Sequence, residues 1–87
     1  MIIISSKNFE KSLKKINPKI QLVLGAKLRI FMNDPWNFTL NNHTLHGSMR
    51  NYRSINITGD YRAIYEEYDK NTVRLIDIDT HSGLYGK

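Results

Sequence analysis

The sequence predicts a small α+β domain in the order βααβββ, an antiparallel sheet with a two-helix hairpin packed on one face. Two observations predict this fold class. Apolar residues recur at helical spacing up to residue 33, and three strand-like runs joined by short turns follow in the second half. A chain of 87 residues has room for a single core, so we expect one domain over residues 1–87.

The first half is expected to hold one strand and two helices. Residues 1–5 are apolar and rich in isoleucine, which favours a strand at an edge of the sheet. Ser6 can cap the helix that follows, and the Asn-Pro pair at 17–18 is typical of the start of a second helix, which ends at 33–35. The apolar stripes of the two helices are Phe9, Leu13 and Ile16 in the first, and Ile20, Val23, Leu24, Leu28 and Phe31 in the second.

The second half is expected to hold a loop and a three-stranded meander. Residues 35–47 are predicted to form the loop. Strand-like runs cover 52–57, 61–68 and 72–79, and turn-forming residues separate them. Alternation in the middle run places Tyr61, Ala63 and Tyr65 on one face and Arg62 and Ile64 on the other. The apolar anchors of the loop are expected to be Trp36, Phe38, Leu40 and Leu45.

The composition excludes several classes of function. The chain has no cysteine, which excludes disulfides, thiolate catalysis and cysteine zinc sites. The opening apolar run, residues 1–4, is too short for a secretory signal or a membrane span, so we expect a cytoplasmic location and no membrane partner. The net charge of +5 favours an anionic partner, either nucleic acid or an acidic protein. Residues 1–33 carry seven lysines and arginines against Glu10 alone.

Residues that could carry chemistry gather between positions 43 and 85. This segment holds all three histidines, all five tyrosines and every arginine except Arg29. Metal-free RNA cleavage needs a base, an acid, cations near the phosphate and a planar surface for the base. Histidine transfers protons near neutral pH and arginine binds two phosphate oxygens at once, so the segment contains each ingredient. A metal set of His43, His46 and His81 is an alternative, but no cysteine or well-placed carboxylate completes it, and we expect neither metal nor cofactor.

Four blocks in this half resemble the RelE/ParE toxin superfamily of type II toxin–antitoxin systems. They are 43–48, the Tyr-Arg pair at 52–53, 60–65 and the closing 80–86. The likeness is greatest to the YafQ-like branch of ribosome-dependent messenger-RNA endonucleases. In the first half it extends only to the strand–helix–helix plan.

The resemblance implies a role for each matching position. His43 and His81 fall on catalytic histidines and Asp60 falls on the active-site aspartate, and we expect His81 to be the general acid and either His43 or Asp60 the base. Arg62 and Arg53 would hold phosphate, and Tyr85 would stack on a base. The remaining RNA-binding candidates are Tyr61 and His46.

Two positions depart from the YafQ-like pattern, and each candidate also has a structural explanation. Asn56 replaces a second histidine, and Asp77 replaces an arginine. Asp60 suits a turn without any other role, and His81 suits a strand end. The tyrosines of the strands are more often packing residues, and the arginines can pair with Glu66 or Glu67 across strands.

The implied function is that of a toxin that cuts messenger RNA in the ribosomal A site. Its implied partners are a cognate antitoxin, the ribosome with its messenger, and operator DNA only through the toxin–antitoxin complex. Two alternatives remain open. One is a ParE-like toxin that stalls DNA gyrase, and the other is a degenerate member that only binds its antitoxin or the ribosome.

Overall fold

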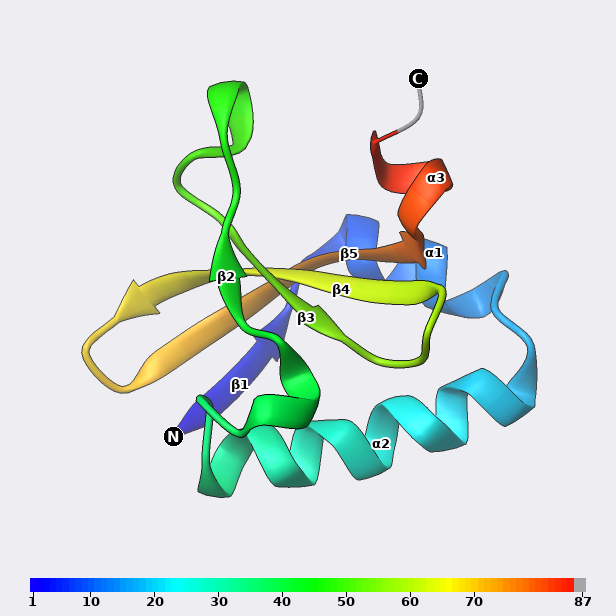
Figure 1. Cartoon of the computed structure of the whole chain (residues 1–87), viewed down its shortest axis with the longest axis horizontal. Helices are drawn as coiled ribbons and strands as arrows, with labels where there is room; N and C mark the ends of the chain where they lie inside the picture. The colour runs from blue at the N-terminus through cyan, green and yellow to red at the C-terminus, as the bar shows by residue number, and fades with distance from the viewer. Residues whose placement is uncertain (86–87) are drawn as a thin grey trace.

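A five-stranded sheet with two long helices makes up the fold, in a computed structural model that describes residues 1–85 (Figure 1). The regular elements, in chain order, are β1 (Ile2–Ser5), α1 (Lys7–Lys14), α2 (Pro18–Asn33), β2 (His43–Thr44), β3 (Arg53–Asn56), β4 (Tyr61–Asp69), β5 (Thr72–Thr80) and α3 (His81–Tyr85). Two single-turn 3₁₀ helices, Phe38–Leu40 and Gly47–Met49, lie before and after β2. The predicted α+β class is confirmed, with the order βααβββ extended by β2 and α3. Gly86, the last residue of the closing motif, lies outside the described residues.

The strand order is β1-β5-β4-β3-β2, so β1 lies at one edge as predicted. Strands β2 to β5 pair antiparallel, because short connections return the chain beside itself. The expectation of a wholly antiparallel sheet is wrong for β1, which pairs parallel with β5. Both helices and three strands lie between β1 and β5 in the chain. Such a long connection allows the two strands to run parallel.

Both helices begin where the sequence predicts. The Ser6 Oγ accepts a hydrogen bond from the Phe9 backbone N–H at 3.0 Å, and the Asn17 Oδ1 accepts one from the Lys19 N–H at 2.8 Å. Pro18 occupies the first turn of α2, where its missing N–H costs nothing. These caps fix the directions in which both helices run against the sheet.

The core lies between the helices and one face of the sheet. Ile55, Ala63 and Ile78 face each other across β3, β4 and β5 and are all fully buried. Phe9 of α1 and Phe31 of α2 are buried in the same cluster, which shows that both helices cover this face. Since side chains alternate along a strand, the intervening residues of β3 and β4 point to the opposite face. That second face is where the candidate site lies.

The segment between α2 and β3 departs from the prediction. It contains β2 and both 3₁₀ turns, and of its four expected anchors only Leu40 is fully buried. Trp36 and Phe38 are 65% and 90% exposed, so the prediction that they anchor the loop is wrong. The short 3₁₀ turn points Leu40 inward and Phe38 outward, and Trp36 instead lies under the Arg53 guanidinium, 4.7 Å from the ring centroid. Among the helices of residues 1–85, none combines the length and the apolar character needed to cross a membrane.

Candidate active site

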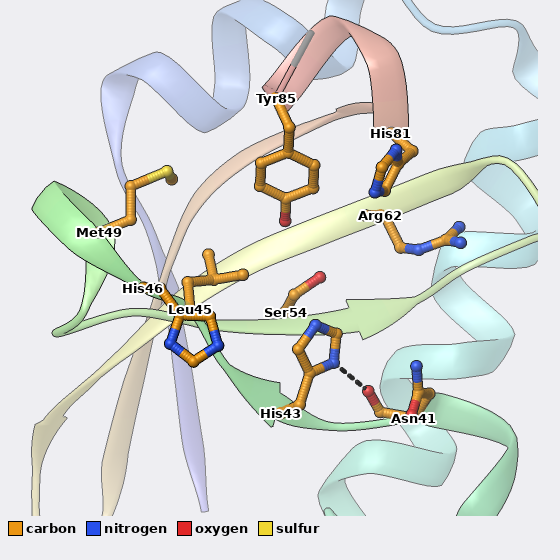
Figure 2. A pocket seen from close by; sticks show the side chains of 9 residues that line it. All are labelled: Asn41, His43, Leu45, His46, Met49, Ser54, Arg62, His81 and Tyr85. Carbon is orange, nitrogen blue, oxygen red and sulfur yellow. Dashed lines mark hydrogen bonds between the residues drawn. The ribbon is translucent and has the colours of Figure 1, made fainter.

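A cavity of about 480 Å³ opens on the sheet face opposite the core (Figure 2). Its walls come from three parts of the chain: the segment around β2, the strands β3 and β4, and the terminal helix α3. The residues that line it are Asn41, His43, Leu45, His46, Met49, Ser54, Arg62, His81 and Tyr85. The volume falls within the range of small-ligand sites in proteins, about 300–1,000 Å³.

His43 lies on β2, with its ring oriented by a neighbouring backbone carbonyl. Its Nδ1 is 2.7 Å from the carbonyl oxygen of Asn41. A carbonyl oxygen only accepts, so this contact requires a proton on Nδ1, and a neutral ring with that proton has its lone pair on Nε2. This second nitrogen points toward Ser54 and the cavity (Figure 2). The contact with Asn41 thus leaves Nε2 as the ring nitrogen that faces the cavity.

His81 and Tyr85 come from α3, the single helical turn that follows β5. The His81 backbone N–H donates to the carbonyl oxygen of Asp60 at 2.9 Å, which ties the start of α3 to the β3–β4 turn. The Thr80 Oγ1 accepts from the Gly83 N–H at 3.0 Å and supports the turn. The two rings meet edge to face with centroids 4.9 Å apart. The helix thus presents an imidazole and a phenol side by side over the cavity.

Arg62 supplies the cation of the site from β4. Its Nη1 donates to the backbone carbonyls of Thr58, Gly59 and Tyr61 at 3.1, 3.1 and 3.2 Å. These contacts all use the same nitrogen and turn the guanidinium toward the β3–β4 turn, at the edge of the cavity that Arg62 lines (Figure 2). Nε and Nη2 have no acceptor among residues 1–85 and remain able to bind two oxygens of one phosphate.

Three predicted site residues are not brought to the cavity. The Asp60 side chain is exposed in the β3–β4 turn, and only its backbone carbonyl reaches the site, through His81. Tyr61 packs against the core on the helix-covered face. Arg53 donates from Nε to the Asn42 Oδ1 at 2.7 Å and lies over Trp36, also away from the cavity. The other five predicted residues line one cavity, with His46 on the side of the β2 segment (Figure 2).

The two departures from the YafQ-like pattern also lie outside the cavity lining. The Asp77 Oδ1 accepts a hydrogen bond from the Ser12 Oγ of α1 at 2.6 Å, so this carboxylate fastens a helix to β5. Asn56 pairs with Arg62 across β3 and β4, and its Oδ1 is buried without a hydrogen-bond partner among the described residues. An acidic residue at position 77 therefore serves packing here.

Sequence reasoning missed five residues that line or support the cavity, Asn41 among them. Leu45 and Met49 form an apolar wall, and Ser54 lies on the floor between His43 and Arg62. Asn42 holds the β2 segment in place, because its Nδ2 donates to the Pro35 carbonyl at 2.9 Å and to the Tyr65 hydroxyl at 2.8 Å. The alternation of β3 places Ser54 on the face of Asn56 and was a usable signal. The contacts of Asn42 join distant parts of the chain and had no local signal.

The Tyr65 phenol lies under the β2 segment and has a perturbed acidity. Burial raises its pKa above the ordinary value of 10.0, while the hydrogen bond from Asn42 acts in the opposite direction. Within residues 1–85 no group of three histidine or carboxylate side chains has an arrangement suited to a metal ion.

The fold and cavity together correspond to the small toxin domain to which the closing motifs pointed. The family model described as ParE toxin of type II toxin–antitoxin system, parDE, matches residues 3–85. The chain therefore belongs to this toxin family, within the RelE/ParE superfamily. Comparison with curated protein sequences found no match.

Solved structures with the same fold include toxins alone and with an antitoxin. The chain is similar to YafQ from E. coli strain BL21(DE3), with a TM-score of 0.81 and 23% identity over 97% of each chain. It is also similar to YafQ in the E. coli DinJ-YafQ complex, with a TM-score of 0.78 and 23% identity over 97% of each chain. The YoeB/ParE toxin from Agrobacterium tumefaciens gives a TM-score of 0.75 at 16% identity, over 93% of this chain and 99% of that one. At these identities the likeness establishes the fold.

Proposed function

We propose that this toxin is a metal-independent endoribonuclease that cuts messenger RNA in the ribosomal A site. One observation carries the proposal: His43 and His81, far apart in the sequence, line one open cavity together with Arg62 and Tyr85. Two imidazoles can act as base and acid in the transesterification of RNA, and a guanidinium can offset the charge on the phosphate. The likeness to YafQ in fold supports the same conclusion.

In the proposed reaction, the ribose 2′-hydroxyl attacks its own 3′-phosphorus. His43 Nε2 takes the hydroxyl proton as the new O2′–P bond forms. His81, in its protonated form, gives a proton to O5′ as the P–O5′ bond breaks. The products are a 2′,3′-cyclic phosphate and a 5′-hydroxyl end. Of the two residues considered for the base, His43 is favoured, because Asp60 lies outside the cavity lining.

The remaining side chains would place the RNA for this step. Nε and Nη2 of Arg62 bind the scissile phosphate and offset the charge that develops on it. The Tyr85 ring offers a stacking surface beside His81. The exposed lysines of α1 (Lys7, Lys11 and Lys14) add sequence-independent contacts to ribosomal RNA, which weaken as salt rises. Activity of this kind belongs in the cytoplasm, where translating ribosomes are found.

The test is cleavage of messenger RNA on programmed ribosomes by purified toxin variants. His81→Ala and His43→Ala should each lower cleavage by about 100-fold or more, since each removes a proton-transfer group. Lys70→Ala, in the β4–β5 turn far from the cavity, is the control and should cut normally. Thermal melts check that each variant is folded. Cleavage at the wild-type rate by a folded His81→Ala variant refutes the mechanism.

We also propose that a cognate antitoxin neutralises the toxin. The basic first third of the chain favours an acidic partner, and a similar fold forms a complex in DinJ-YafQ. Operator DNA would be bound only through that complex. Co-expression with the neighbouring small open reading frame should relieve growth arrest and give a complex in gel filtration, and failure of both would contradict this partner.

A second candidate function is inhibition of DNA gyrase, which the ParE description of the matching family favours. A gyrase supercoiling assay separates it from RNA cleavage, because a gyrase inhibitor acts without ribosomes. A third candidate, a binding module without activity, is supported by Asn56 and Asp77. Growth arrest on induction that is lost in His81→Ala would exclude this third function.

A further inference from the structure

The Ser54 hydroxyl is a buried polar group without a partner at the floor of the cavity. Ser54 is only 1% exposed, and its Oγ has no hydrogen-bond partner among residues 1–85. Burying a hydroxyl without a hydrogen bond destabilises a folded protein, so buried hydroxyls are nearly always paired. A group in this state inside a cavity is one that a ligand can satisfy.

The sheet register places Ser54 between the two groups that flank the proposed scissile phosphate. On β3 it lies directly opposite His43 of β2, and its neighbour on the same face, Asn56, lies opposite Arg62 of β4. His43, Ser54 and Arg62 therefore project from three adjacent strands to the same face. Figure 2 shows the Ser54 hydroxyl pointing into the space below Tyr85, beside the ring of His43.

The Tyr85 hydroxyl is a second buried polar group without a hydrogen-bond partner among the described residues. Its oxygen points toward the same part of the cavity as Ser54 (Figure 2). Two unsatisfied hydroxyls in one cavity indicate a ligand with hydrogen-bond acceptors at this depth. With Arg62 at the wall, the acceptor that fits best is an anionic oxygen.

We propose that Ser54 is a substrate-binding residue whose Oγ–H donates a hydrogen bond to a non-bridging oxygen of the scissile RNA phosphate. This inference rests on the proposed ribonuclease function and adds a binding group to the same site. The hydroxyl fixes the phosphate between the base and Arg62, so that the 2′-oxygen and the 5′-oxygen are in line with phosphorus. Ser54 takes no proton in the reaction.

The closing experiment compares Ser54→Ala with Ser12→Ala. The Ser12 hydroxyl is already bonded to Asp77 inside the protein, so its removal should lower the melting temperature and leave cleavage unchanged. Removal of the Ser54 hydroxyl should leave the melting temperature equal or higher, because no internal hydrogen bond is lost. It should lower kcat/KM on programmed ribosomes by about 10- to 100-fold, the worth of a hydrogen bond to a charged group.

A binding titration separates contact with phosphate from contact with the base. The probes are the four ribonucleoside 3′-monophosphates and the same nucleosides without phosphate, followed by NMR. Ser54→Ala should weaken binding of the monophosphates about 10-fold and leave the nucleosides unchanged. The inference is overturned if Ser54→Ala weakens binding of both kinds of probe equally, or of neither. It is also overturned if the wild type binds no monophosphate, or if Ser54→Ala has a lower melting temperature than the wild type. If Ser54→Ala weakens monophosphate binding but the wild-type toxin does not cut RNA, only the proposed function is refuted. If the wild type and Ser54→Ala cut RNA equally well, only the role of Ser54 is refuted.

Discussion

Replacement of Asn42 by alanine tests whether one amide holds the β2 segment over the sheet. The side chain makes three hydrogen bonds to separate parts of the chain: its Nδ2 donates to Pro35 and Tyr65, and its Oδ1 accepts from Arg53. Asn42 directly precedes His43, so these bonds fix where β2 begins. Loss of this residue should disturb both stability and the site.

The expected loss of unfolding free energy in Asn42→Ala follows from the hydrogen bonds that are lost. The two neutral hydrogen bonds contribute about 1 kcal/mol each. The bond from Arg53 is charged, but Arg53 is partly exposed, so water replaces part of its contribution when the bond is lost. Allowing for relaxation, we expect Asn42→Ala to lower the free energy of unfolding by about 2 kcal/mol. In a domain of this size that corresponds to a fall in Tm of roughly 8–16 °C. Tyr65→Phe removes only one of the bonds and should cost about 1 kcal/mol.

Thermal and urea unfolding of both variants and the double variant measure these values. The double variant should show a coupling of about 1 kcal/mol between the two side chains. A second readout is the ultraviolet titration of tyrosine. Because the hydrogen bond from Asn42 lowers the pKa of the Tyr65 phenol, that pKa should rise further in Asn42→Ala. A Tm loss no larger than that of Tyr65→Phe, with an unchanged phenol titration, would contradict this reasoning.

Two further predictions concern α3 and alkaline pH. Gly83→Ala should reduce RNA cleavage with little change in Tm, because a Cβ there would lie 2.5–2.9 Å from the Asp79 carboxylate and displace it from its hydrogen bond with the Thr80 N–H, next to His81. Gly25→Ala, whose Cβ meets only the Arg29 guanidinium at 3.9 Å, should raise Tm and leave cleavage unchanged, and equal cleavage by both variants would contradict the role of α3. Since burial raises the pKa of Tyr65, the folded state favours its neutral form. The contribution of the neutral phenol to stability is present below pH 10.0 and should be lost as pH rises through the raised pKa. Tyr65→Phe should not show this loss, and an equally steep fall of its unfolding free energy at alkaline pH would refute the prediction.

The local rules of the sequence predicted most of the secondary structure. The capping positions Ser6 and Asn17 gave the starts of both helices, because a cap depends only on residues within one turn. Alternation in β4 placed Ala63 and Tyr65 on one face and Arg62 on the other, because strand periodicity is a local property, and the structure shows that the first face is the core. These are interactions between residues close in the chain.

What the sequence could not predict depends on distant contacts. The parallel pairing of β1 with β5 is set by the path of the helical connection. Alternation placed Tyr61 on the face of Ala63 and Tyr65, but only the packing of the helices shows that this face is the core and not an RNA contact. The partnerless state of the Ser54 hydroxyl is a property of its surroundings in three dimensions. The same holds for the bond between Asp77 and Ser12, which gives an acidic residue a packing role at a position expected to be basic.

The two faces of the sheet explain how such a short chain supports both a core and a site. Along β3 and β4, Ile55 and Ala63 face the helices, while Ser54 and Arg62, one position earlier, face the cavity. Substitutions of the polar residues on this face remove little of the apolar burial that holds the domain together, whereas its Ile64 is fully buried. The polar residues of the site can therefore vary while the fold is kept, which accounts for Asn56 on a sheet that retains the YafQ-like architecture. On this reasoning the activity of the chain must be judged from the groups that reach the cavity, His43, His81 and Arg62, and not from the number of family positions that it matches.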